Sequence, residues 1–111
     1  MHAFHKAIIA TILMLALQLV SLSSWALAQR PLDVPGAVGT FASGINTAGA
    51  IVGGYTDSRG TDHGFLWQGG TFTALDVPGA VSTFASDIND AGTIVGGSTD
   101  GRDTVHGFVI P

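Results

Sequence analysis

Short hydrophobic stretches of five to eight residues, separated by polar and glycine-rich turns, make up the chain from residue 29 onward. No stretch there keeps the 3.6-residue period of an amphipathic helix, and strands joined by tight turns produce such a pattern. Asparagine, aspartate and glycine occupy the turns, because these residues tolerate a positive φ. The pattern predicts an all-β fold, with the first four strands over Thr40–Asn46, Ala50–Tyr55, Asp62–Trp67 and Thr71–Val77.

The details of the first two predicted strands suggest how they pack. A period of two over the first strand places Phe41, Ser43 and Ile45 on one face. In the second strand, Gly53 and Gly54 carry no side chain, which indicates a bulge or a close neighbour.

The same plan occurs twice along the chain. When residues 32–67 are laid over residues 75–110, 26 of the 36 aligned positions are identical, at a constant spacing of 43 residues. One supersecondary unit is therefore used twice. Four short strands per unit is the size of a β-propeller blade, so we predict two propeller-blade-like, four-stranded antiparallel repeats. A small sandwich or barrel and a β-solenoid are the alternatives.

These patterns divide the chain into three parts. Repeat 1 covers residues 29–74 and repeat 2 covers residues 75–111, which stop before any counterpart of Thr71–Ala74. We expect Leu32–Val34 to supply the missing fourth strand by pairing with the end of the chain. Residues 1–28 combine a basic start, a short apolar run and Ala26-Leu27-Ala28, which is typical of a helical secretory signal peptide cleaved after Ala28. An uncleaved membrane anchor is the alternative, although the apolar run is shorter than the ~20 residues that a spanning helix needs.

The composition after residue 28 limits the partners. It holds three arginines, eight aspartates, no lysine and no glutamate, which gives a formal net charge of −5. This sign does not suit nucleic acid or an anionic membrane surface, because both attract clustered Lys and Arg. The absence of cysteine excludes disulfides and a lipid-modified cysteine. Stability must come from packing, association or bound ions.

Two ordered motifs recur in register and carry a family resemblance. The first reads G-I-N-T-A-G-A-I-V-G over residues 44–53 and D-I-N-D-A-G-T-I-V-G over residues 87–96; the second reads H-G-F-L-W over residues 63–67 and H-G-F-V-I over residues 106–110. The two motifs resemble the HAF-type probable extracellular repeat of secreted bacterial proteins. They differ from the letters of the family name at Gly64 and Gly107, where the name has alanine. The resemblance implies export and a repeated β architecture. It implies no catalytic residues.

His63 and His106 are the histidines of the two repeats, and they hold equivalent positions. Each is a candidate metal ligand or general base. On a strand, however, His63 shares a face with Phe65 and Trp67, so we expect it to bond to a nearby turn. A zinc site needs three or four converging ligands, and neither histidine has a second histidine or a cysteine near it in sequence. We therefore predict no metal site and no cofactor.

The turn aspartates offer oxygen ligands for a cation, but their spacing is not that of a Ca²⁺ loop. Aspartate also closes turns by accepting hydrogen bonds from its own backbone two residues on. We expect the turn role, with cation binding as the alternative, and we expect Arg59 and Arg102 to pair locally with carboxylates. The aspartates concerned are Asp33, Asp57 and Asp62 in repeat 1 and Asp90, Asp100 and Asp103 in repeat 2.

Enzymatic signatures are missing from the sequence. There is no GxSxG, no HExxH and no phosphate-binding glycine loop, and Ser43 and Ser86 are duplicated within a repeated strand, which favours packing. The sequence therefore predicts no catalytic residue. Two aromatic residues of repeat 1, Tyr55 and Trp67, have no aromatic counterpart in repeat 2. They are candidate ligand-binding residues because exposed aromatic rings stack on sugars, with a core position as the alternative for Trp67.

These observations predict a secreted, non-enzymatic β-repeat protein, periplasmic or extracellular, that serves as a structural or interaction module. Repeat architectures generally need at least three units, so we expect self-association or binding to other repeat proteins, for example three copies in a six-bladed ring. A shortened relative of longer repeat proteins is the alternative to assembly. A glycan-binding, lectin-like assembly and a fragment of an extracellular enzyme are the alternative functions. We expect no nucleic-acid partner, and no membrane contact after signal cleavage.

Overall fold

The described part of the chain is all-β and forms two antiparallel sheets. The computed structural model describes residues 29–111, so the predicted signal peptide lies outside the described residues. Sheet A contains four strands in sequence order, and sheet B contains three. Their bounds are β1 (Gly39–Ile45), β2 (Ile51–Thr56), β3 (Asp62–Gln68) and β4 (Thr71–Leu75) in sheet A, and β5 (Ser82–Ile88), β6 (Ile94–Thr99) and β7 (Val105–Ile110) in sheet B.

The four predicted strands of repeat 1 are all present. The last one ends at Leu75 rather than Val77, because Val77 begins a turn in which its carbonyl accepts a hydrogen bond from the Ala80 N–H over 3.0 Å. The expectation that Leu32–Val34 forms a fourth strand of sheet B is wrong: these residues form no strand, and sheet B consists of β5, β6 and β7.

A β-bulge interrupts the first strand of each repeat. The register between β1 and β2 shifts between Ala42 and Gly44, and the register between β5 and β6 shifts between Ala85 and Asp87. A bulge inserts one extra residue and so reverses the side-chain alternation beyond it. Phe41 and Ile45 consequently lie on opposite faces of sheet A, and the prediction that they share one face is wrong.

The glycine pair of β2 permits close packing, as the sequence predicts. A Cβ atom on Gly53 would lie 2.9 Å from Cε1 of Phe65, and one on Gly54 would lie 2.6 Å from Cζ of Phe41. Each glycine therefore accommodates an aromatic ring from a neighbouring strand, on opposite faces of the sheet.

Paired residues of antiparallel strands share a face, which defines two faces for each sheet. The valine face carries Val52 and Leu66 in sheet A, and the equivalent Val95 and Val109 in sheet B. The isoleucine face carries, among other residues, Ala42, Ile45 and Ile51 in sheet A, and the equivalent Ala85, Ile88 and Ile94 in sheet B.

The core lies where the isoleucine face of sheet B covers the valine face of sheet A. Its buried members are Ala50, Val52, Ala85, Ile88 and Ile94, with Leu66, Leu75 and Phe108 packed against them. Burying an aliphatic side chain of this size contributes roughly 1.5–3 kcal/mol, so this contact between repeats is the main apolar stabilisation of the unit.

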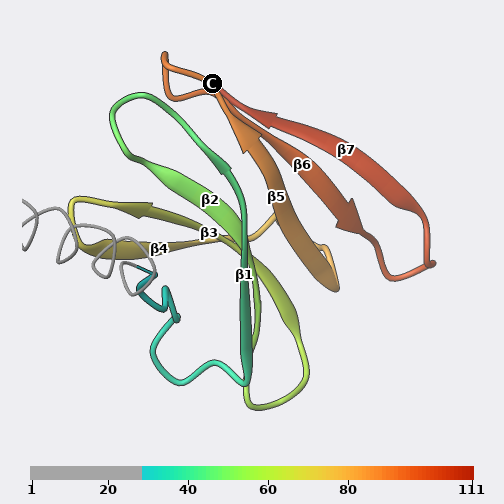
Figure 1. The fold of residues 1–111 in the computed structure, drawn as a ribbon. Helices are drawn as coiled ribbons and strands as arrows, with labels where there is room; N and C mark the ends of the chain where they lie inside the picture. Colours follow the sequence, from blue (N-terminus) through green and yellow to red (C-terminus); the bar gives the residue numbers. More distant parts are fainter. Residues whose placement is uncertain (1–28) are drawn as a thin grey trace, which may run out of the picture. The chain divides into compact units, whose positions relative to one another are not determined.

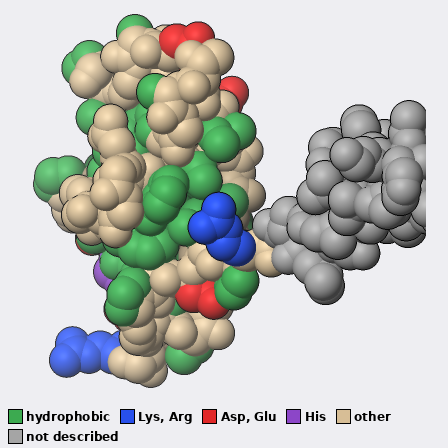
Figure 2. Space-filling model, turned by 60° about the vertical axis from the view of Figure 1, so that its left-hand side comes forward, with side chains coloured by type: hydrophobic (Ala, Val, Ile, Leu, Met, Phe, Trp, Pro, Cys, Tyr) green, Lys and Arg blue, Asp and Glu red, His purple; other side chains and the backbone are tan. Residues whose placement is uncertain are grey.

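Figure 1 shows β5 next to sheet A, with β4 and β7 on opposite sides of the region where the sheets meet. Figure 2 shows hydrophobic side chains gathered over the middle of the face that it presents. Among residues 29–111, no helix is long and apolar enough to cross a membrane.

Candidate functional site

A histidine held between two carboxylates is the most organised polar cluster among the described residues. Nε2 of His63 lies 2.8 Å from Oδ2 of Asp57, and Nδ1 lies 2.7 Å from Oδ1 of Asp76. The ring of Tyr55 stacks on the imidazole, with 4.9 Å between the ring centroids and 26° between the planes. We call these four residues the His63 cluster.

Local structure positions each member of the cluster. Tyr55 and His63 are paired across β2 and β3, which places both rings on the isoleucine face. Asp57 begins the turn between these strands, and its Oδ1 accepts hydrogen bonds from the N–H groups of Arg59 and Thr61, over 2.8 and 3.0 Å. These bonds confirm the predicted turn role of Asp57, and they leave Oδ2 for the histidine. Asp76 comes from the segment that leads into repeat 2.

The carboxylates favour the protonated imidazole. Hydrogen bonds to Asp57, and then to Asp76, raise the pKa of His63 above its usual 6.5. In return, the hydrogen bond from His63 and those from the Thr61 and Arg59 backbone lower the pKa of Asp57 to about 2. Burial, followed by the negative charges of Asp76 and Asp57, raises the pKa of Tyr55. The two carboxylates therefore extend the pH range over which the imidazole of His63 is protonated.

Its geometry leaves the imidazole no free nitrogen. A general base needs a ring nitrogen directed at the proton that it removes. In His63, both ring nitrogens face carboxylates at hydrogen-bond distance. The predicted bond between this histidine and a nearby turn is confirmed, and the arrangement is suited to tying a turn and a linker to β3.

The second repeat contains half of this cluster. Nε2 of His106 lies 2.8 Å from Oδ2 of Asp100, which closes the equivalent turn through bonds from Arg102 and Thr104. The residue equivalent to Asp76 would follow β7, and Nδ1 of His106 has no carboxylate partner among residues 29–111. The side chain of His106 is 56% exposed, against 21% for His63.

Three hollows lie beside the repeated segments. One of about 340 Å³ borders His63 and Asp76, and one of about 470 Å³ is lined by Val34, Tyr55, Phe65 and Phe72 among others. A third, of about 260 Å³, lies between the Leu75–Pro78 linker and β7. The last two are equivalent places in the two repeats, beside the phenylalanine of the H-G-F motif.

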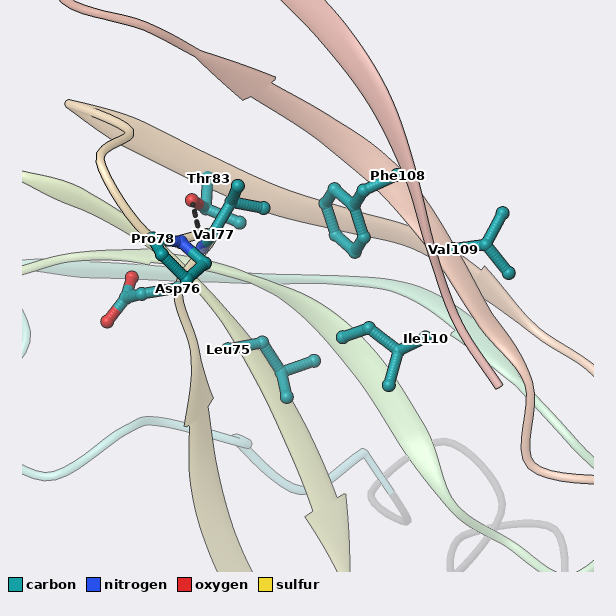
Figure 3. Close-up of a pocket in the computed structure, with 8 residues that line it drawn as sticks. All are labelled: Leu75, Asp76, Val77, Pro78, Thr83, Phe108, Val109 and Ile110. Atoms are coloured by element: carbon teal, nitrogen blue, oxygen red, sulfur yellow. Dashed lines mark hydrogen bonds between the residues drawn. The ribbon is translucent and has the colours of Figure 1, made fainter.

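Within residues 29–111, the hollow beside β7 lacks the fourth strand that lines its counterpart in repeat 1. In sheet A, Phe72 of β4 packs edge-to-face on Phe65, with 5.4 Å between ring centroids. Among the described residues, sheet B has no strand paired with the outer edge of β7. Figure 3 shows Leu75, Phe108 and Ile110 pointing into the resulting space, while Val109 points away from it.

The two candidate ligand-binding residues lie on one face but at different places. Tyr55 pairs with His63, whereas Trp67 pairs with Ile51. Tyr55 and Ile51 are four residues apart on β2, which corresponds to about 13 Å along a strand. Both aromatic side chains are half-buried. They do not form one continuous aromatic platform.

The remaining candidate residues take structural roles. Asp62 accepts a hydrogen bond from the Thr56 hydroxyl over 2.6 Å, and Asp90 accepts one from the Thr47 N–H over 2.9 Å. Among residues 29–111, no three His or Asp side chains are arranged to hold a metal ion. The ion pairs in this part of the chain all join histidine to aspartate, so the predicted local pairing of Arg59 and Arg102 with carboxylates is wrong.

Sequence reasoning did not identify Asp76 as a partner of His63. The signal was available, because the aspartate of L-D-V-P-G-A-V and the histidine of H-G-F are duplicated together. Comparison of this chain with protein-family models, with curated proteins and with solved structures finds no match. The resemblance to the HAF-type repeat therefore rests on the motifs of the chain itself.

Proposed function

We propose that this chain is an exported, non-enzymatic β-repeat protein that acts as a structural or interaction module outside the cytoplasm. Export is supported by the signal-like composition of residues 1–28. The module role is supported by the way in which the two repeats pack on each other, with propeller-blade-like sheets as the packing unit.

The observation that carries the proposal is that identical residues in the two repeats have opposite exposure. On the valine face, Val52 is 0% exposed and Val95 is 42% exposed. On the isoleucine face, Ile88 is 7% exposed and Ile45 is 64% exposed. Each face is therefore suited to burial against another β-repeat, and at these positions each is covered in one repeat only. Uncovered apolar faces of this kind mark interaction surfaces.

The His63 cluster supports the non-enzymatic part of the proposal. Both of its ring nitrogens are taken up by carboxylates, and the equivalent His106 repeats only the turn-closing contact. A polar cluster that recurs with the fold is expected of a scaffold.

The proposal is tested by following the full chain in a bacterial host. We expect the periplasmic or external fraction to contain a protein whose intact mass corresponds to residues 29–111. We expect no turnover in a broad hydrolase screen at high protein concentration. Retention of the uncleaved chain in the cytoplasm would contradict export. Turnover that His63→Gln abolishes would instead favour the enzyme-fragment alternative.

Glycan binding is the second candidate, and one difference between the repeats favours it. Tyr55 and Trp67 lie on the isoleucine face of repeat 1, where Tyr55 is half-buried while its counterpart Ser98 is 3% exposed. At this position an aromatic residue thus replaces a smaller one where solvent has access, whereas Trp67 is half-buried and its counterpart Ile110 is 37% exposed. Binding on a glycan array that Trp67→Ala removes without changing the circular dichroism would support this candidate; an array without signal would count against it.

A further inference from the structure

We propose that the occupant of the two uncovered faces is a second copy of this chain, joined head to tail, with Asp33 of the second copy bonded to His106. The inference rests on the proposed function and names its partner. It follows from the internal contact between repeats, which already shows how these faces fit.

The internal contact joins unlike faces of like units. Sheet A contributes its valine face and sheet B its isoleucine face. Residues at equivalent positions also meet: Nδ2 of Asn46 donates to the main-chain oxygen of Asn89 over 3.1 Å, and the Thr47 N–H donates to Asp90. The operation that relates the repeats is therefore directional. A directional contact can be repeated without limit, and it produces either closed rings or filaments.

The two uncovered faces are complementary because they have the composition of the internal contact. The valine face of sheet B presents Val95 and Val109, the counterparts of Val52 and Leu66. The isoleucine face of sheet A presents Ala42 and Ile45, the counterparts of Ala85 and Ile88. A second copy placed by the same operation sets its repeat 1 on the repeat 2 of the first.

The polar contacts of the internal junction identify what the second copy supplies. Within the chain, His63 receives Asp76 from the start of repeat 2. The equivalent acceptor for His106 would be the aspartate that begins the next repeat, and Asp33 is the counterpart of Asp76. Asp33 is exposed and has no side-chain hydrogen bond among residues 29–111. In the same part of the chain, Nδ1 of His106 has no carboxylate partner.

The same operation also places residues of the second copy beside β7, at the open edge of sheet B. Leu75 ends β4 and pairs with Gly64 of β3. Leu32 is the counterpart of Leu75, and Gly107 is the counterpart of Gly64. Leu32 of the second copy would therefore lie opposite Gly107, beside the hollow that Phe108 and Ile110 line (Figure 3).

Two close contacts of the internal junction are not repeated at the proposed one. The bond from the Thr47 N–H to Asp90 has no counterpart, because Asp90 would face Thr47 of the second copy, which has no carboxylate. The second is the packing of Gly44 against Asp87. A Cβ atom on Gly44 would lie 2.9 Å from Cα of Asp87. At the proposed junction the two residues exchange places, so that the real Cβ of Asp87 meets Gly44 of the second copy. Because the neighbour is a backbone atom and the distance is so short, this pair requires a shift of the main chain at the junction. Asp87→Gly removes the extra atoms and should tighten association.

The direct test is to express the full chain, purify the protein and measure its mass in solution by light scattering after size-exclusion chromatography. We expect an assembly that Val95→Asp and Ile45→Asp each reduce to a monomer. Mixing the two variants should restore a one-to-one dimer, because each retains the face that the other lacks. Val109→Asp provides a second valine-face variant if Val95→Asp fails to fold.

Single-charge variants test the named contact. Asp33→Asn should weaken association about two- to fivefold, which is the usual range for a partly exposed ion pair. Asp62→Asn removes the same charge from a residue whose hydrogen bond, from the Thr56 hydroxyl, lies within sheet A, and it should leave the association constant within about twofold. Equal effects of the two variants would overturn the Asp33–His106 contact.

A monomer at about 100 μM, a concentration at which even a weak dimer with a micromolar Kd is mostly formed, would overturn the head-to-tail inference. A dimer that persists in Val95→Asp would also overturn it, because that result means that two isoleucine faces meet. Neither result would contradict the proposed export or the proposed non-enzymatic role. Hydrolase turnover, by contrast, would contradict the proposed function and leave the assembly as it is.

Discussion

Asn46 donates a hydrogen bond from Nδ2 to the main-chain oxygen of Asn89, over 3.1 Å, although the two asparagines hold the same position in their repeats. Each also closes its own turn, since Asn46 Oδ1 accepts from the Ala50 N–H and Asn89 Oδ1 accepts from the Thr93 N–H. The pair therefore separates a turn-closing role, which both residues share, from a contact between repeats, in which only Asn46 uses its side chain.

We expect Asn46→Ala to lower the free energy of unfolding by about 1 kcal/mol more than Asn89→Ala, which is the usual contribution of one hydrogen bond. Urea denaturation of the two variants at equal protein concentration measures the difference. Equal losses would mean that the bond between the repeats contributes nothing to stability.

Stability should depend on pH through the His63 cluster. The raised pKa of His63 stabilises the fold below pH 6.5, and this contribution is lost as the pH rises through the folded-state pKa. The lowered pKa of Asp57 stabilises the fold above pH 3.8, and this contribution is lost as the pH falls toward about 2. The free energy of unfolding should therefore be highest between about pH 4 and about pH 6.5.

Urea denaturation between pH 2 and pH 9 measures this profile. His63→Gln should remove most of the decrease above about pH 6.5, because the titrating group is gone. His106→Gln is the matched control and should retain it, since the second histidine has one carboxylate partner instead of two. A profile that stays flat on the alkaline side in the unaltered protein would contradict the role given to His63.

The turn between β6 and β7 holds a strained aspartate. Asp103 has a φ of 64°, whereas Gly60 at the same place in repeat 1 has a φ of 82°. Glycine reaches this region without the steric cost of a Cβ atom. We expect Asp103→Gly to raise the free energy of unfolding by about 0.5–1 kcal/mol, and Gly60→Asp to lower it by a similar amount. Thermal unfolding of both variants tests the pair; a loss in Asp103→Gly would contradict the account.

The adjacent glycines of β2 should differ in their tolerance of a methyl group. On Gly54 the added carbon meets the ring of Phe41, whose side chain is exposed and can turn aside. On Gly53 it meets the backbone carbonyl of Phe41, which is fixed in the sheet. We expect Gly53→Ala to cost about 3 kcal/mol and Gly54→Ala about 1 kcal/mol, and chemical denaturation compares them. The reverse order would show that the Phe41 ring is the more rigid neighbour.

The sequence predicted the strands and turns of repeat 1 because short-range features determine them. Asn46, Asp57 and the glycines close turns through their own side chains and backbone, and these contacts depend on residues that are close in sequence. The bulge after Ala42 was not predicted, because a period-two pattern assumes regular pairing with a neighbour. The error placed Phe41 and Ile45 on the same face.

Burial could not be predicted from local sequence. Val52 and Val95 occur in the same I-V-G-G tetrapeptide, yet Val52 is fully buried and Val95 is exposed. The difference depends on whether another sheet covers the position, and no local pattern contains that information. For the same reason, the pairing of His63 with its turn was predicted, whereas its bond to Asp76 in the following repeat was not.

The offset of 43 residues between contacting partners has a consequence for how such a protein changes in length. If this segment of the gene were duplicated once more, the new repeat would pack on a surface that the existing repeat already has. Growth by recombination would then require no adaptive redesign, and the number of units could vary in descendants faster than the residues within them.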